Sequence, residues 1–279
     1  MDEYRVRSLS SDELSLPLDW AAAEGWNPGL NDASAFAVQD PAGFLVGELA
    51  GQPIATISAV RYGTDFGFIG FYIVHPSWRG QGFGWRLWQA GMERLAGRTV
   101  GLDGVVAQQE NYRRSGFVLA HRNIRFGGVG VAAPPEAGLI ALGSVPEAAL
   151  LEYDRRHFGW DRPNFLRVWQ SQPNATGWAL WNSGQLRGYG CVRRCRSGCK
   201  IGPLFADTEA GAEHLFNALA GFAPGEPLFL DLPEPNGAAR ALAERHQLAP
   251  VFETARMYAG PAPALPLDRI YGITSFELG

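Results

Sequence analysis

A glycine-spaced loop between a predicted strand and a predicted helix constrains the fold of this chain more than any other feature. Residues 66–74 are apolar, aromatic or β-branched and predict a strand, whereas the apolar spacing after Gly84 is typical of a helix. The connecting residues are Arg79-Gly80-Gln81-Gly82-Phe83-Gly84. The first turn of a helix has unpaired N–H groups and a partial positive charge, and glycines let the backbone approach a ligand closely. The stretch therefore predicts a pyrophosphate site formed by the N–H groups of about residues 80–85, with a charge-assisted contact from Arg79.

Three interpretations of this loop compete. The first is a plain tight turn that binds nothing. The second is the dinucleotide fingerprint G-x-G-x-x-G, for which Asp103 lies near the distance of the ribose-binding acid. The glycines here are spaced G-x-G-x-G, however, and they follow apolar runs at 44–48, 52–62 and 66–74, which predict an antiparallel meander rather than a βαβ unit. The third interpretation depends on a second motif further along the chain.

That second motif, together with the loop, resembles the GNAT superfamily of N-acetyltransferases. Arg79–Gly84 matches the family sequence Arg/Gln-x-x-Gly-x-Gly/Ala, and Tyr112–Phe117 matches Tyr-x-x-x-Gly-Phe, with Gly116 as a helix C-cap. The elements predicted over residues 4–126 also follow the family order. The resemblance implies transfer of an acetyl group from acetyl-CoA, as co-substrate, to an amine of a small molecule or peptide.

The resemblance also implies which residues hold the cofactor. The backbone of the strand before the loop would pair with the pantetheine amides as an added strand would, and the loop would hold the diphosphate. The expected cofactor-binding residues are Tyr72, Ile73, Val74, Arg79, Gly80, Gln81, Gly82, Phe83, Gly84 and Trp85. Many relatives carry an Asn seven residues before the tyrosine; this chain has Val105 there, which leaves Gln108 or Gln109 as candidates for that contact.

Two catalytic residues are expected from the same resemblance. Tyr112 occupies the family's general-acid position, and a phenol can protonate a leaving thiolate; its alternative is an aromatic packed on the sheet. Many relatives use a Glu on the strand before the loop as the base, but residues 66–74 contain no carboxylate. Asp103 is the candidate base instead, with a plain turn residue as the alternative. The missing carboxylate favours a second function, a non-catalytic acyl-CoA-binding sensor or partner module.

The candidate acceptor residues are Trp26, Asn27 and Glu24, because this region forms the acceptor wall in relatives. The alternative is that these residues only pack the loop in which they lie.

The second half of the chain repeats the order of predicted elements without a close sequence repeat. We predict an α+β fold of two tandem GNAT-like domains, each a mixed, largely antiparallel sheet flanked by helices. Their expected bounds are 1–127 and 139–279, joined by a Gly-, Ala- and Pro-rich linker at 128–138. The segments 196–207 and 253–258 resemble the C-terminal domain of bacterial tandem GNAT proteins. No Arg-x-x-Gly-x-Gly is present there, so this degenerate half is expected to close the acceptor pocket rather than to bind a second cofactor.

Composition excludes other classes of function. The formal net charge of −4 disfavours binding to nucleic acid, although a basic stretch lies at 193–200. No apolar run is long enough for a membrane span and no secretory signal is evident, so a cytoplasmic location is expected. Cys191, Cys195 and Cys199 are spaced C-x₃-C-x₃-C, unlike the C-x₂-C pairs of common zinc sites, and no metal is expected.

Overall fold

The computed structural model describes residues 4–131 and 138–279. We call these segments the N-terminal half and the C-terminal half. Of the predicted linker, residues 132–137 lie outside the described residues. The N-terminal half contains β1 Tyr4–Ser8, α1 Ser15–Ala23, α2 Asp32–Gln39, β2 Phe44–Leu49, β3 Gln52–Tyr62, β4 Phe66–Val74, α3 Phe83–Arg94, β5 Thr99–Val105, α4 Gln109–Arg114 and β6 Val118–Val129. The C-terminal half contains β7 Leu139–Ala141, α5 Glu147–Phe158, α6 Pro163–Trp169, β8 Ala175–Asn182, β9 Gln185–Arg194, β10 Cys199–Ala206, α7 Glu209–Ala220, β11 Pro227–Pro233, α8 Gly237–Arg245, β12 Ala249–Ala259 and β13 Ile270–Gly272.

The strands form one continuous mixed sheet in which antiparallel pairs dominate. Its order is β1-β2-β3-β4-β5-β12-β6-β11-β10-β9-β8-β7, with β13 paired to β10. Only β4 with β5 and β10 with β11 pair in parallel within the described residues. The predicted α+β class, with a mixed and largely antiparallel sheet flanked by helices, is confirmed.

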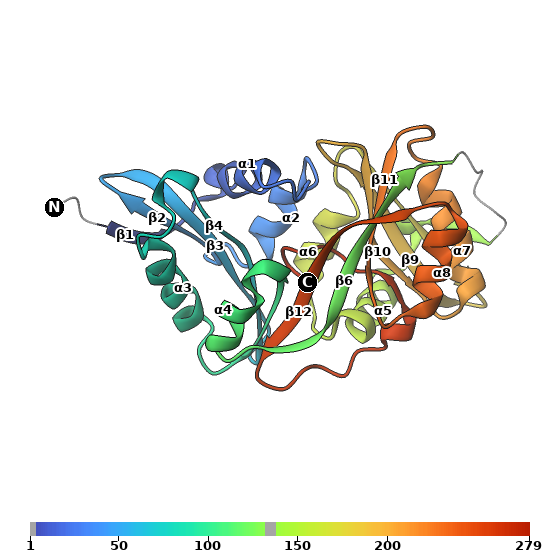
Figure 1. Cartoon of the computed structure of the whole chain (residues 1–279). Helices are drawn as coiled ribbons and strands as arrows, with labels where there is room; N and C mark the ends of the chain where they lie inside the picture. The colour runs from blue at the N-terminus through green and yellow to red at the C-terminus, as the bar shows by residue number, and fades with distance from the viewer. Residues whose placement is uncertain (1–3, 132–137) are drawn as a thin grey trace.

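The two halves exchange their last long strands. β12 pairs with β5 through Ala259↔Val100 to Thr254↔Val105, and β6 pairs with β11 through Pro227↔Val129 to Pro233↔Asn123. β6 and β12 also pair with each other, and Figure 1 shows them side by side across the middle of the molecule. The predicted bounds of 1–127 and 139–279 follow the order along the chain, whereas this pairing crosses them. The bounds stay a prediction.

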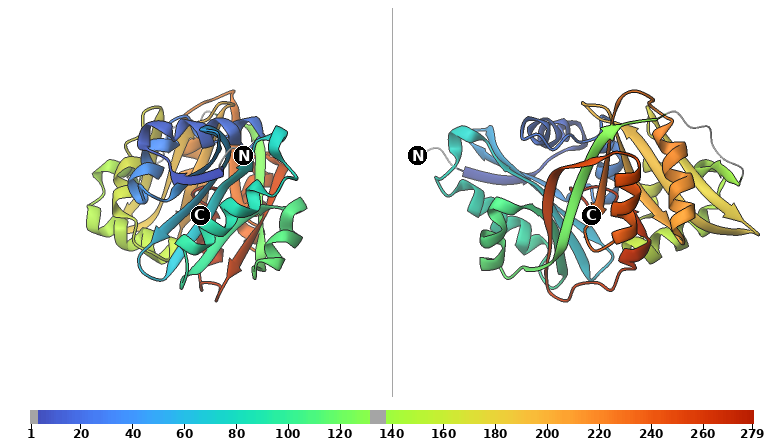
Figure 2. Two further views of the ribbon diagram at one scale, coloured as in Figure 1. Left: turned by 90° about the vertical axis from the view of Figure 1, so that its left-hand side faces the viewer. Right: turned by 45° about the vertical axis from the view of Figure 1, so that its right-hand side comes forward.

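The helices lie on both faces of the sheet. Figures 1 and 2 show α3 and α4 on one side of the N-terminal strands and α1 and α2 on the other, where they meet the C-terminal half. Side chains on the α1–α2 side of the sheet form part of a hydrophobic cluster whose residues come from both halves. Within it, the Phe36 ring stacks on Trp169 of α6 with ring centroids 6.1 Å apart. Burial of this shared apolar surface holds the halves together.

Buried ion pairs add polar contacts between elements that are far apart in sequence. Asp32 of α2 accepts hydrogen bonds from Arg193 of β9, at 2.7 Å from Nε and 3.2 Å from Nη2. Arg125 of β6 likewise donates to Asp231 of β11 at 2.6 and 2.8 Å. All four side chains are at most 4% exposed. The three cysteines nearby are buried free thiols.

The segment after β12 returns to the C-terminal half and fills a gap in its sheet. β10 and β11 are paired in parallel only from Cys199↔Leu228 to Ile201↔Leu230. Beyond that point β13 pairs with β10, and the Ile273 N–H donates to the Asp231 carbonyl of β11 at 2.8 Å. The place where these two strands separate is thus occupied by the chain itself.

The Asp32–Arg193 pair provides a test of how the halves are joined. We expect Asp32→Asn to lower the free energy of unfolding by roughly 3 kcal/mol, because it leaves the buried Arg193 charge uncompensated. Urea denaturation followed by circular dichroism measures the change. Asp12→Asn, which alters an exposed carboxylate, is the matched control and should cost less than about 0.5 kcal/mol. Equal stability of the two variants would contradict the importance of the pair.

Candidate active site

The candidate site lies where β4 and β5 separate. Their parallel pairing runs from Phe66↔Thr99 to Ile69↔Leu102 and then stops. Just beyond it β4 has a bulge: the register with β3 shifts, Phe71 adopts a φ of +47°, and its carbonyl accepts a hydrogen bond from the Thr56 hydroxyl at 2.9 Å. A cavity of about 700 Å³ opens at this fork. Its walls come from β4, β5, α3, α4, β12, the α1–α2 connection and the C-terminal tail.

The glycine loop is exposed beside this cavity and leads into α3. Gly80 and Gly82 have φ values of +76° and +83°, which a side chain would strain. Gly84 is required for another reason: a Cβ there would lie 2.7 Å from Val74 Cγ2 and 2.8 Å from the Tyr72 hydroxyl. The first N–H groups of α3 have no partner within the helix. The loop therefore has the geometry of an anion site next to the end of β4.

Arg79 connects this loop to its surroundings. Its Nε donates to the Val74 carbonyl at 2.9 Å, and its Nη2 forms an ion pair with Glu24. Both Arg79 and Glu24 line the cavity. The sequence analysis expected Arg79 to contact a phosphate, which stays a prediction. The observed role is to hold the loop against β4 and the α1–α2 connection.

The remaining predicted cofactor residues fall into two groups. Tyr72, Ile73, Val74 and Trp85 line the cavity. Gly80, Gln81, Gly82, Phe83 and Gly84 form the loop and the start of α3 outside its wall. Position 105 is Val where many relatives have an Asn, and Gln108 and Gln109 were the candidates to replace its contact. Of these two, Gln108 lines the cavity and accepts a hydrogen bond from Asn111 at 2.6 Å.

Tyr112 lines the cavity at α4. Its ring packs on Trp88 at a centroid distance of 5.6 Å, and Gly104 leaves room for it, since a Cβ at Gly104 would lie 2.2 Å from Tyr112 Cε2. Burial raises the pKa of Tyr112 above its ordinary value. The hydroxyl therefore stays protonated at neutral pH and can donate a proton or a hydrogen bond into the cavity.

Asp103 also lines the cavity, but its carboxylate is held by other side chains. Arg256 of β12 donates to Oδ1 at 2.9 Å and to Oδ2 at 2.6 Å, and Asn123 of β6 donates to Oδ1 at 2.8 Å. The Asp103 side chain is 0% exposed. Its oxygens therefore already accept three hydrogen bonds from Arg256 and Asn123. This environment disfavours Asp103 as a base, and its predicted role stays untested.

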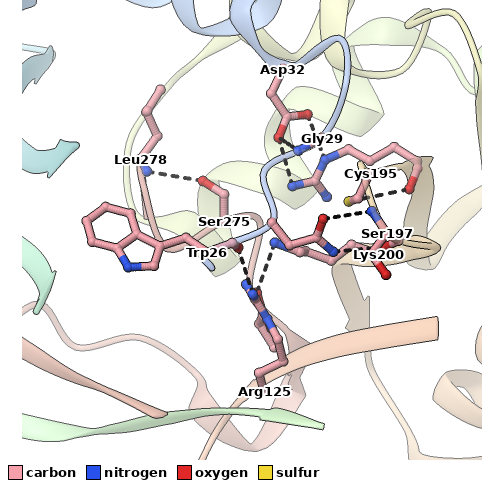
Figure 3. Close-up of polar contacts among 12 residues, drawn as sticks. Trp26, Gly29, Asp32, Arg125, Cys195, Ser197, Lys200, Ser275 and Leu278 are labelled. Atoms are coloured by element: carbon pink, nitrogen blue, oxygen red, sulfur yellow. Dashed lines mark hydrogen bonds and ion pairs between the residues drawn. The ribbon is translucent and has the colours of Figure 1, made fainter. Parts of the chain in front are cut away.

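The three predicted acceptor residues have different positions. Trp26 and Glu24 line the cavity, whereas Asn27 is not part of its wall. The Asn27 amide instead pairs with Ser197 in both directions, donating to its carbonyl at 2.9 Å and accepting from its N–H at 3.0 Å. Figure 3 shows this region, in which the Trp26 carbonyl accepts a hydrogen bond from Arg125 at 2.7 Å. Asn27 thus joins the two halves.

The cavity residues that come from the second half of the chain were not predicted from the sequence: Phe252 and Thr254 of β12, and Phe276 and Glu277 of the C-terminal tail. Thr254 lies in the segment 253–258 that resembles tandem GNAT proteins, whereas the other three belong to no motif that the sequence analysis identified. The strand exchange places the first two there, and the path of the tail after β13 places the others.

The sequence analysis also expected neither a membrane span nor a metal site. Among residues 4–131 and 138–279, no helix is both long and apolar enough to span a membrane. In the same ranges, no group of three or more His, Cys, Asp or Glu side chains is arranged to hold a metal ion.

Comparison with known proteins identifies the family. Residues 6–117 match the model of the acetyltransferase (GNAT) family, and residues 150–272 match that of an acetyltransferase (GNAT) domain. A holothin acyltransferase from Pseudoalteromonas sp. (strain SANK 73390) is 32% identical, with 100% of this chain and 97% of the relative covered.

Solved structures show the same fold. A putative acetyltransferase from Pyrococcus horikoshii superposes with a TM-score of 0.84 at 22% identity, covering 99% of this chain and 96% of the other. A tandem GNAT protein from the clavulanic acid biosynthesis pathway gives a TM-score of 0.63 at 16% identity, with 94% and 100% covered. The strand fork, the glycine loop and the full-length relative together show that this chain belongs to the GNAT acetyltransferase family, as a tandem two-domain acyltransferase.

Proposed function

We propose that the protein transfers an acetyl group from acetyl-CoA to an amine, by direct attack of the neutral amine. The observation that carries this proposal is the separation of β4 and β5 beyond Ile69 and Leu102, which opens a cavity of about 700 Å³ beside the exposed start of α3. Acetyl-CoA supplies an activated acyl thioester. The family match supports acyl transfer; the acetyl group and the amine are our inference.

The residues present fit the parts of acetyl-CoA. The end of β4 at Tyr72–Val74 has no β5 partner. Apart from the Val74 carbonyl, which accepts a hydrogen bond from Arg79, its free backbone groups are available to the pantetheine amides. The N–H groups at the start of α3 suit the diphosphate. The Tyr112 hydroxyl is available to protonate the leaving thiolate.

The acceptor side of the cavity supports a small-molecule amine over a peptide. Its wall includes the aromatic side chains of Trp26, Phe252 and Phe276, which suit an apolar or aromatic body. The full-length relative is named for holothin, and we extend to this chain the inference that the acceptor is a small molecule. A cytoplasmic location stays a prediction.

The loop assignment is tested by Arg79→Glu. We expect this change to raise the dissociation constant for acetyl-CoA at least about tenfold, or ~1.4 kcal/mol, because a glutamate at position 79 repels Glu24 and cannot donate to the Val74 carbonyl. Isothermal titration calorimetry measures the affinity. Arg240→Glu, at an exposed position on α8, has the same charge change and should bind as the wild type does. Unchanged affinity of Arg79→Glu would remove the loop from the site.

The acid role is tested by Tyr112→Phe. We expect kcat to fall about 100-fold, because the leaving thiolate loses its proton donor, while the affinity for acetyl-CoA stays within about twofold. Thiol release and calorimetry separate the two effects. Tyr271→Phe removes the hydroxyl of a tyrosine in the C-terminal half that does not line the cavity, and it should leave both quantities unchanged. Full activity of Tyr112→Phe would exclude the acid role.

A further inference from the structure

One buried arginine holds the three aromatic residues on the acceptor side of the cavity. The Arg125 guanidinium lies 4.9 Å from the ring centroid of Phe276 and 5.8 Å from that of Phe252. It also donates a hydrogen bond to the Trp26 carbonyl at 2.7 Å, as Figure 3 shows. The two phenylalanine rings are in contact with each other, with centroids 6.0 Å apart. The tail, β12 and the α1–α2 connection thus form one aromatic wall, which Arg125 contacts without lining the cavity itself.

This aromatic wall is poorly suited to an ammonium group. An aromatic ring attracts a cation through the negative charge on its face. Arg125 already lies over both phenylalanine rings, and an arginine stays protonated in proteins. Its charge is in turn bound by Asp231, which accepts two hydrogen bonds from it at 2.6 and 2.8 Å. A second cation at the wall would therefore meet the charge of Arg125 and no free counter-ion.

The other charges around the tail are balanced in the same way. The charged side chains around the carboxylate of the tail residue Glu277 are the cations Lys200, Arg125 and Arg193 and the anions Asp32 and Asp231. Both carboxylate oxygens of Glu277 are buried, so its charge offsets these cations instead of serving the cavity. No excess negative charge is left beside the aromatic wall among the described residues.

The two other carboxylates of the cavity wall are also bound. In the part of the chain that the structure describes, these are Asp103 and Glu24. Asp103 accepts two hydrogen bonds from Arg256, at 2.9 and 2.6 Å, and is 0% exposed. Glu24 forms an ion pair with Arg79. Each carboxylate therefore has a cation of the protein as its partner, and an ammonium group would have to compete for it.

The remaining titratable side chains of the described wall are phenols and guanidinium groups. Burial raises the pKa of Tyr72 to about 12 and also raises the pKa of Tyr112. Arg79 and Arg114 are cationic. At neutral pH these four side chains donate hydrogen bonds and do not take up a proton. An ammonium group in this cavity would lose its hydration without a charge to replace it, whereas a neutral amine loses much less.

Resting on the proposed acetyltransferase function, we propose that the acceptor is an aromatic amine whose nitrogen is uncharged at neutral pH. Conjugation of the nitrogen lone pair with the ring lowers the basicity of such an amine. Its flat apolar ring suits a wall made of Trp26, Phe252 and Phe276. The side chains that bind the charges of one another then need not bind a charge of the substrate.

The reaction of such an amine balances without a further proton acceptor. The nitrogen lone pair forms the C–N bond to the thioester carbonyl carbon, and the C–S bond breaks. Tyr112 gives its proton to the departing sulfur, and one of the two N–H protons of the amine replaces it on the phenol. The products are the aromatic amide and the free CoA thiol, and no proton is released to solvent.

The test compares two matched pairs of amines on the wild type, with acetyl-CoA as donor and thiol release as the readout. Aniline and 5-aminoindole are uncharged between about pH 6 and about pH 8.5, whereas benzylamine and tryptamine are ammonium ions there. All four are assayed across this range. The ratio of kcat/KM for benzylamine to kcat/KM for aniline should rise about tenfold per pH unit, because only the neutral fraction of benzylamine reacts. Tryptamine and 5-aminoindole should behave in the same way. The ratio cancels the titration of enzyme groups that affect both amines of a pair.

The position of the acceptor is tested by Phe276→Leu. We expect KM for aniline and 5-aminoindole to rise at least about threefold, because a ring contact is lost, while the affinity for acetyl-CoA stays unchanged. Phe222→Leu is the matched control, since the Phe222 ring lies 5.7 Å from Arg194 and outside the cavity wall. It should behave as the wild type does. An unchanged KM in Phe276→Leu would overturn the placement of the acceptor, and the wild-type comparison holds even if this variant does not fold.

The remaining outcomes separate this inference from the proposed function. A ratio that stays constant with pH shows that the enzyme itself deprotonates the ammonium ion, and it overturns the inference alone. Turnover of the alkyl amines without turnover of either aromatic amine does the same. If no amine leads to thiol release although acetyl-CoA binds, the acetyltransferase proposal is wrong and the inference is lost with it.

Discussion

The insertion of β12 between β5 and β6 is the interaction on which the rest of the structure depends. Its backbone hydrogen bonds satisfy the edge of β5, and they place Arg256 against Asp103 on the same face as the cavity. The same strand contributes Phe252 and Thr254 to the cavity wall. Because β6 in turn completes the sheet of the C-terminal half, neither half has a full sheet without residues from the other. The site is therefore a joint product of both GNAT domains.

Both halves contain a parallel strand pair that separates, but the space between the strands is filled in only one of them. In each, a parallel strand pair separates after three or four residue pairs. In the N-terminal half the separation is left open as a cavity, which the end of β4 lines. In the C-terminal half β13 occupies the separation, so the backbone groups there are satisfied within the chain. One half thus leaves strand backbone open to a cavity, whereas the other covers it with its own C-terminal segment.

Most of the buried carboxylates in residues 4–131 and 138–279 are paired with an arginine. Asp154 with Arg162 follows the same two-bond pattern as the pairs of Asp32, Asp103 and Asp231. Each bidentate pair offsets the cost of taking its carboxylate out of water. Glu277 has no hydrogen-bond partner for its carboxylate among the described residues, and its charge offsets the nearby cations Lys200, Arg125 and Arg193.

The sequence by itself determined the helices and strands, the glycine loop and the motif around Tyr112, because these depend on local periodicity and on backbone conformations such as the positive φ of Gly80 and Gly82. It also identified Asp103, Asn27 and Trp26 as candidate site residues. Only the tertiary structure decided that Arg256 binds Asp103 from 153 positions away, that Asn27 binds Ser197, and that Glu277 lies at the fork. Those contacts follow from which strand lies beside which, and pairing between distant strands is set by the packing of the whole chain rather than by any local pattern.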